Sequence, residues 1–312
     1  MKFTKMQGCA NDYVYVNCFS EKVSDMGAFA KAVSNRHTGI GSDGAIFICP
    51  SDEADCEMKM YNADGSYSEM CGNGLRCVAK YVYDNNIVDK KELSIISGGA
   101  LKRVWLEVAE ETPSLMGLKF SKRTDGMAVS RVKVDMGEPI LNCEDIPVDL
   151  SEGCEENRGS DSACTDTQEK NNTMCISRDI DIDNTCYKMT CVSMGNPHCV
   201  VYVDDVKNVE IEKTGPLFEN NKCFPKRVNT EFSKVVDKKN VEMRVWERGA
   251  GETLACGTGA CAVAVASILN GYTDEEVTIH LLGGDLEIFW DRKNTNHVFM
   301  TGAAVTVFEG EI

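Results

Sequence analysis

The sequence predicts a mixed α/β (α+β) protein built from two similar halves, and three observations lead to this prediction. The signature Cys-Gly-x-Gly occurs twice, at 71–74 and at 256–259, and each copy opens a helix-like run. An asparagine stands 60 residues before each cysteine, at Asn11 and at Asn196, and begins a strand-like run. Strand-like runs dominate the rest of the chain. Two signatures repeated at one spacing indicate an internal duplication.

The expected strands are runs that are rich in β-branched or aromatic residues, or that alternate between apolar and polar, bounded by Gly, Asn and Asp. They lie at 13–18, 45–49, 57–61, 93–97, 103–108, 129–135, 187–192, 199–203, 241–246, 277–282, 286–290 and 305–308.

Helix signals are fewer. The run 74–84 places apolar residues at helical spacing. The run 259–269 is apolar on all sides and ends at Asn-Gly, a good helix terminus. Such a helix must be buried all round, which predicts a strongly curved sheet wrapped about it. A third helix is expected at 26–35.

Composition bounds the class of protein. The 312 residues suffice for two domains, and a net charge of −16 without a basic cluster argues against nucleic-acid binding and against anionic membranes. The N-terminus lacks the apolar core of a signal peptide, and no apolar run is long enough for a bilayer span. The chain is therefore expected in the cytoplasm.

Sixteen cysteines are many for such a chain. Because they sit in apolar runs of a long chain, we expect reduced thiols, most of them packing residues. No Cys-x-x-Cys pair is present, so a metal site is not predicted. Residues 151–184 are rich in acidic and small polar residues and are expected to form a surface insertion, with Cys154, Cys164, Cys175 and Cys186 spaced through a loop.

Cys71 and Cys256 are the candidate catalytic groups. Each precedes a helix, where unpaired backbone N–H groups and the helix dipole favour negative charge, so we expect lowered thiol pKa values. The same N–H groups can bind a carboxylate. A thiolate on one face of an amino-acid Cα and a thiol on the other can invert the stereocentre without cofactor or metal. No nucleotide-binding glycine motif is present.

The chain resembles the diaminopimelate epimerases along almost its whole length. The resemblance rests on five blocks, at 5–13, at 61–66 leading to 71–74, at 194–198, at 227–232, and at 246–253 leading to 256–259. Related racemases share the cysteine turns, whereas the Arg-x-Asn-x-Glu-Phe block and the Glu-Arg-Gly run point to the epimerase.

The resemblance implies roles for individual residues. Cys71 and Cys256 are then the two catalytic bases, and His198 and Glu247 are candidates for tuning their pKa values. The substrate-binding residues it implies are Asn11, Asn62, Gly72, Asn73, Asn196, Asn229, Glu247, Arg248, Gly257 and Thr258. Glu247 and Arg248 would hold the distant ammonium and carboxylate of the substrate. Some family members carry Gln where this chain has Gly44, so one polar contact is not assured there.

The resemblance also implies the architecture. Two pseudo-symmetric domains are expected, each a curved, mainly antiparallel sheet or barrel around a central helix. The first would cover 1–128 plus 301–312, and the second 129–300 with the acidic insertion. The implied reaction interconverts LL- and meso-diaminopimelate in lysine and peptidoglycan biosynthesis. Diaminopimelate is the expected partner, and family analogy adds a homodimer.

Two alternatives stay open. A racemase of another amino acid could use the same scaffold, although a substrate without a second charged end would have little use for Glu247 and Arg248. A non-catalytic thiol or metal-binding protein could use the many cysteines.

Overall fold

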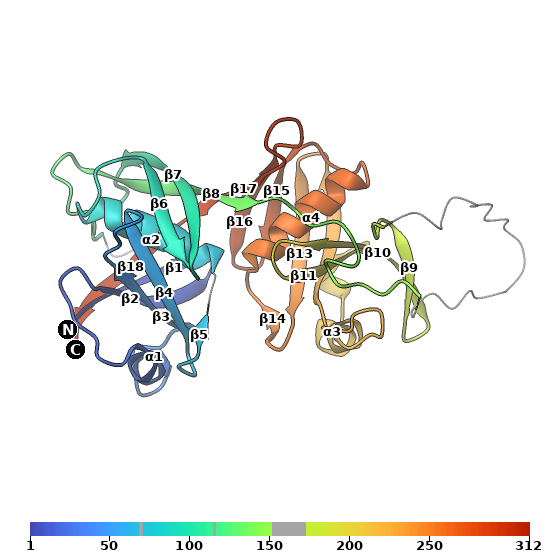
Figure 1. Cartoon of the computed structure of the whole chain (residues 1–312), viewed down its shortest axis with the longest axis horizontal. Helices are drawn as coiled ribbons and strands as arrows, with labels where there is room; N and C mark the ends of the chain where they lie inside the picture. The colour runs from blue at the N-terminus through green and yellow to red at the C-terminus, as the bar shows by residue number, and fades with distance from the viewer. Residues whose placement is uncertain (69–70, 115–116, 152–172) are drawn as a thin grey trace, which may run out of the picture. The chain divides into compact units, whose positions relative to one another are not determined.

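The computed structural model describes residues 1–68, 71–114, 117–151 and 173–312. The chain forms two compact units (Figure 1). Unit 1 consists of Met1–Asp135, Gly283–Leu286 and Phe299–Ile312, and unit 2 of Met136–Leu282 and Glu287–Val298.

Unit 1 consists mainly of strands and has two helices within its described residues. In chain order they are β1 (Lys2–Gly8), β2 (Asn11–Asn17), α1 (Met26–Ser34), β3 (Gly44–Cys49), β4 (Cys56–Asn62), β5 (Tyr67–Ser68), α2 (Gly72–Asp84), β6 (Glu92–Ser97), β7 (Ala100–Glu110), β8 (Met127–Gly137) and β18 (Val305–Glu311). The ends of β8, β16 (Gly284–Trp290) and β17 (Val298–Ala303) fall in different units.

Unit 2 repeats this plan. Its elements are β9 (Arg178–Ile182), β10 (Thr185–Ser193), β11 (Pro197–Tyr202), a 3-10 turn η2 (Val206–Asn208), α3 (Ile211–Glu219), β12 (Asn229–Asp237), β13 (Asn240–Glu247), β14 (Gly251–Thr253), α4 (Gly257–Leu269) and β15 (Glu276–Leu281).

The strand pairings repeat in the same order. In unit 1, β1 and β2 are antiparallel, β2 and β3 parallel, β3 and β4 antiparallel, and β4 pairs antiparallel with β5 and parallel with β6. In unit 2 the same five relations join β10, β11, β12, β13, β14 and β15. The duplication expected from two short signatures therefore extends to the pairing of six strands in each unit.

The helices occupy matching places. α1 and α3 each connect the two parallel strands, and α2 and α4 each follow the short strand that precedes a cysteine. α2 packs against β1, β2, β6 and β7, while α4 packs against β10, β11, β12 and β15. Residues 259–268 of α4 are all buried, as its apolar sequence requires. The chain therefore has the predicted sheet-dominated α/β class with a central helix in each unit.

Three helices follow the sequence pattern, and the fourth does not. α1, α2 and α4 lie where they were predicted, although α2 and α4 begin two residues earlier, at the glycine after each cysteine. α3 was not predicted, because Gly215 and Pro216 interrupt its pattern. No helix in the described ranges is long and apolar enough to cross a membrane.

The prediction of a loop over 151–184 was wrong for its last third. Residues 152–172, with Cys154 and Cys164, lie outside the described residues. Beyond them, β9 pairs with β10 and buries Ile180 and Ile182 in the core of unit 2. Cys175 is also fully buried there. Polar and apolar residues alternate over 178–182, which is a strand signal. The acidic composition of the whole segment led instead to the prediction of a loop.

Candidate active site

Cys71 caps the N-terminus of α2. Its backbone is extended, with φ −145° and ψ 108°, and its Sγ accepts a hydrogen bond from the Gly74 N–H at 3.3 Å. The thiol itself donates to Oδ1 of Asn11 at 3.3 Å. The cysteine thus stands where Ser, Thr or Asp usually caps a helix, with its sulfur beside the amides of the first turn.

The amide of Asn11 is held in one orientation. Its Nδ2 donates to Oδ2 of Asp43 at 2.8 Å, which leaves Oδ1 facing Cys71. Asp43 in turn accepts from Arg36, and the same Arg36 nitrogen reaches Asp12 at 2.8 Å. This ion-pair network therefore holds the side chain of Asn11, the first substrate-binding candidate, in place.

Asn73 and Asn62 differ in burial and in their hydrogen-bond partners. Asn73 is buried in the first turn of α2, and its Nδ2 approaches Oδ1 of Asn11 at 3.5 Å. Its Oδ1 is buried and has no hydrogen-bond partner among the described residues. Asn62 ends β4 and donates to Oγ of Ser66 at 3.0 Å.

Gly44 begins β3 in a position without space for a side chain. A Cβ there would lie 2.1 Å from the carbonyl oxygen of Tyr61 and 3.0 Å from the ring of Tyr13. Because a backbone atom cannot move as a side-chain tip can, a longer residue at position 44 would require a shift of the strand.

Cys256 caps α4 in the same way. Its φ of −121° and ψ of 111° resemble those of Cys71, and its Sγ accepts from the Gly259 N–H at 3.4 Å. Oγ1 of Thr258 lies 3.5 Å from the sulfur. Two cysteines at equivalent positions therefore share one capping geometry, and Gly72 and Gly257 supply the first amide of each helix.

Glu247 lies at the end of β13 and is partly buried. Its Oε1 accepts a hydrogen bond from Oγ1 of Thr253 at 2.5 Å. Burial raises the pKa of Glu247, while this hydrogen bond and the nearby His198 lower it. The charge of Glu247 in turn raises the pKa of Cys256, so the two groups are electrostatically linked.

His198 connects a buried carboxylate to Asn196. Its Nδ1 lies 2.6 Å from Oε1 of Glu231, and both side chains are fully buried. Its Nε2 lies 3.0 Å from Oδ1 of Asn196. The imidazole therefore orients the Asn196 amide, as Asp43 orients that of Asn11.

The side chain of Asn229 holds the backbone of Arg248. Asn229 is almost fully buried, its Nδ2 donates to the Pro197 carbonyl at 2.8 Å, and its Oδ1 accepts from the Arg248 N–H at 2.9 Å. One Asn229 N–H remains for a ligand. The exposed Arg248 donates through Nη1 to the Lys226 carbonyl at 2.9 Å and keeps other guanidinium donors.

The predicted lowering of both thiol pKa values was wrong. Burial raises the pKa of Cys71 and raises that of Cys256 well above its usual value. Hydrogen bonds from Gly74 and Gly259 act in the opposite direction but are the smaller effect. The charges of Glu247 and Glu231 raise the pKa of Cys256 further.

Sequence reasoning missed Tyr13, Asp43 and Glu231. In the parallel strand pairs, Tyr13 is opposite Gly44 and His198 is opposite Asn229, so Tyr13 is the unit 1 counterpart of His198. A hydrogen bond from Tyr13 lowers the pKa of Cys71. For Tyr13 the signal was present, because Tyr13 follows Asn11 by two positions as His198 follows Asn196.

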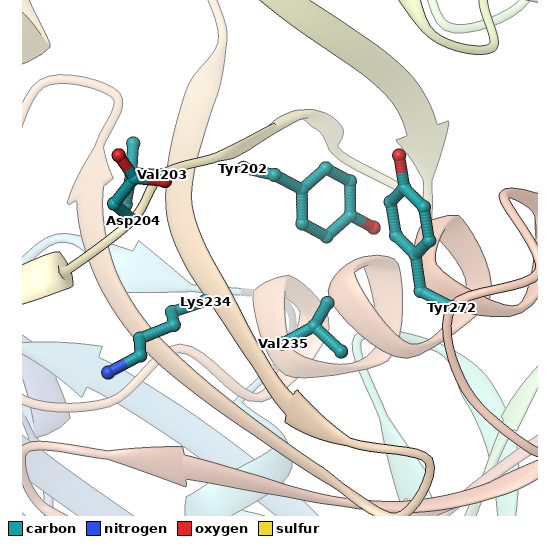
Figure 2. Close-up of a pocket in the computed structure, with 6 residues that line it drawn as sticks. All are labelled: Tyr202, Val203, Asp204, Lys234, Val235 and Tyr272. Atoms are coloured by element: carbon teal, nitrogen blue, oxygen red, sulfur yellow. The ribbon is translucent and has the colours of Figure 1, made fainter.

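A separate pocket of about 320 Å³ lies at the other end of α4. Figure 2 shows the rings of Tyr202 and Tyr272 next to each other, while the side chain of Lys234 points away from them. The Tyr202 hydroxyl bonds Oγ of Ser267, which lies ten residues along the helix from Gly257, about 15 Å at 1.5 Å per residue. The pocket is thus remote from Cys256 within unit 2.

Comparison with known proteins assigns the family. The family model described as "Diaminopimelate epimerase" matches residues 3–119 and 190–307. A diaminopimelate epimerase of Agathobacter rectalis is 54% identical over 312 residues, covering 100% of this chain and 99% of the relative. The chain belongs to the diaminopimelate epimerase family. A second relative so named, from Methanococcus maripaludis, is 49% identical, with coverage of 100% and 99%.

This member of the diaminopimelate epimerase family also resembles solved structures in its fold. A phenazine biosynthesis protein of the PhzF family from Bacillus anthracis has a TM-score of 0.65 at 14% identity, covering 100% of this chain and 98% of the other. A hydroxyproline epimerase from Agrobacterium vitis has a TM-score of 0.61 at 10% identity, with coverage of 100% and 90%. At these identities the likeness concerns the fold.

Proposed function

We propose that this protein epimerises LL-diaminopimelate to meso-diaminopimelate by a two-base mechanism, with Cys71 and Cys256 as the bases. The observation that carries the proposal is the matched capping geometry of these two thiols in a chain of the diaminopimelate epimerase family. The product serves lysine and peptidoglycan biosynthesis.

The chemistry needs an anion-binding site and two proton carriers. The amides of Gly72 and Asn73, and of Gly257 and Thr258, lie at helix N-termini and are suited to a substrate carboxylate. When one thiolate removes the Cα proton, charge moves into that carboxylate, and each well-placed donor can stabilise it by roughly 3 kcal/mol. The other thiol then donates a proton to the opposite face.

The remaining residues divide the recognition of the substrate. We propose that Asn11, Asn62, Asn196 and Asn229 hydrogen-bond the substrate. The exposed guanidinium of Arg248 takes the distal carboxylate and the carboxylate of Glu247 the distal ammonium. His198, bonded to Glu231, keeps Asn196 in place and adjusts the electrostatics near Cys256.

The reaction proceeds in this proposal without pyridoxal phosphate or metal, because the thiols and amides carry the charge. We propose catalytic halves of 1–128 plus 301–312 and of 129–300, each with one cysteine, and a homodimer by family analogy. Free thiols at 71 and 256 suit a reducing compartment, which supports a cytoplasmic location.

The test is turnover in deuterium oxide. Purified protein is incubated with LL- or meso-diaminopimelate, and the stereoisomers are separated and analysed by mass spectrometry. We expect interconversion with deuterium at the reacting Cα of the product. Interconversion without deuterium would contradict proton transfer through the thiols. Proline and glutamate, assayed in parallel, should remain unchanged, whereas turnover of either would favour a racemase.

A further inference from the structure

Glu219 is a buried carboxylate with three hydrogen-bond donors around it. It is the last residue of α3 and is only 5% exposed. Its Oε2 accepts from the indole Nε1 of Trp246 at 2.7 Å. Its Oε1 accepts from Nη1 of Arg227 at 2.9 Å and from the Gly249 N–H at 3.0 Å. A buried carboxylate with this many donors is firmly fixed.

Gly215 allows the indole to reach this carboxylate. A Cβ at Gly215 would lie 2.4 Å from two ring atoms of Trp246, so the ring rests directly on the α3 backbone one turn before Glu219. Glycine has a low helix propensity, but at position 215 it leaves room for the indole ring of Trp246 against the helix. α3 therefore contacts the end of β13 through both a packing surface and an acceptor.

These contacts lie on both sides, along the chain, of Arg248, the residue proposed to bind the distal carboxylate. Trp246 and Gly249 lie on either side of Glu247 and Arg248 in the chain, and both are bonded to Glu219. The Arg248 N–H is held by Asn229, which follows Arg227 by two residues. The backbone on both sides of Arg248 is thus anchored, while its guanidinium keeps donors for a ligand.

We propose that Glu219 is a positioning residue that sets the place of Arg248 and thereby the preference for substrates with a distal carboxylate. The inference rests on the proposed function and deepens it. Glu219 touches no reacting atom in this proposal. It acts through the turn that carries Arg248, so its loss should weaken binding in the ground state and the transition state alike.

The main test is Glu219→Gln. An amide offers an acceptor on one side only, so an N–H must face either Trp246 Nε1 or the donors Gly249 and Arg227. We expect the KM for diaminopimelate to rise by about tenfold or more, while kcat changes by less than about threefold. The matched control is Glu212→Gln, because Glu212 is an exposed residue of the same helix, and its KM should be unchanged.

A double-mutant cycle separates positioning from a general loss of fold. If Glu219 acts through Arg248, Glu219→Gln adds no further increase in KM to an Arg248→Ala variant. An equal increase in both backgrounds, or an unchanged KM in the single variant, would overturn the inference. If Glu219→Gln does not fold, Trp246→Phe, which keeps ring packing and removes one donor, decides the question by the same cycle.

The two proposals fail in distinguishable ways. A wild-type protein that leaves diaminopimelate unchanged refutes the proposed function. A wild type that turns it over, with Glu219→Gln showing wild-type KM, refutes only the role of Glu219.

Discussion

At the scale of single residues, effects of opposite sign act on the pKa of Cys256. The helix N-terminus and the Gly259 N–H favour a thiolate, whereas burial and the carboxylates of Glu247 and Glu231 disfavour it, and the second group dominates. The thiol is therefore the resting form near neutral pH. A resting thiol suits the proton-donating role in a two-base reaction.

Glu247→Gln should make Cys256 more reactive. Removing the negative charge lowers the pKa of Cys256, and because only the thiolate is alkylated, the reaction with iodoacetamide at pH 8 should become faster. Peptide mass spectrometry gives the rate at each cysteine.

Cys71, measured in the same digest, is the internal reference, because burial dominates the shift of its pKa and the charged group that lowers it is Arg76. In the wild type, alkylation of Cys256 should still accelerate above pH 9, since its pKa is raised above that value. Slower alkylation of Cys256 in Glu247→Gln would show that the carboxylate helps to form the thiolate.

At the scale of elements, the two helix starts share the Cys-Gly-x-Gly signature but differ in packing. A Cβ at Gly74 would lie 2.6 Å from Cδ1 of Ile46, the flexible tip of a side chain. A Cβ at Gly259 would lie 2.7 Å from Oε1 of Glu231, which is buried and bonded to His198. The first neighbour can move, whereas the second is fixed by its pair.

Gly259→Ala should therefore destabilise the protein more than Gly74→Ala. Overpacking against a fixed group typically costs about 1–3 kcal/mol, and a shift of one side-chain tip costs less. Thermal unfolding of the two variants, followed by circular dichroism, measures the difference. Equal melting temperatures would mean that Glu231 can move away from the start of α4.

The sequence predicted those features that depend on neighbours along the chain. The periodicity of α2 and α4 and the turns at Cys71 and Cys256 are local, and they were found correctly. The role proposed for Glu219 depends on hydrogen bonds from Trp246 and Gly249, about thirty residues away in the chain, and the sequence around α3 does not indicate them. The direction of the thiol pKa shifts was missed for the same reason, because the helix start is visible in the motif and burial is not.

At the scale of the whole molecule, the proposed two-base mechanism uses the duplication to divide one reaction between two cysteines, one in each unit. Each unit has its own fold, its own core and one capping cysteine. In a two-base mechanism neither thiol can complete the inversion alone, because one face of the Cα would lack its proton carrier. The units are then structurally similar but chemically interdependent.

The interdependence predicts non-additive effects of the two cysteines. Cys71→Ala and Cys256→Ala should each lower kcat/KM for diaminopimelate by about 10³-fold or more, while the double variant should be no slower than either single one. Stereoisomer separation after long incubation measures all three, and circular dichroism checks that each is folded. If each thiol worked independently with water as its partner, the two losses would multiply in the double variant. A multiplied loss would thus contradict a shared reaction, since groups that act as one unit lose their whole effect when either is removed.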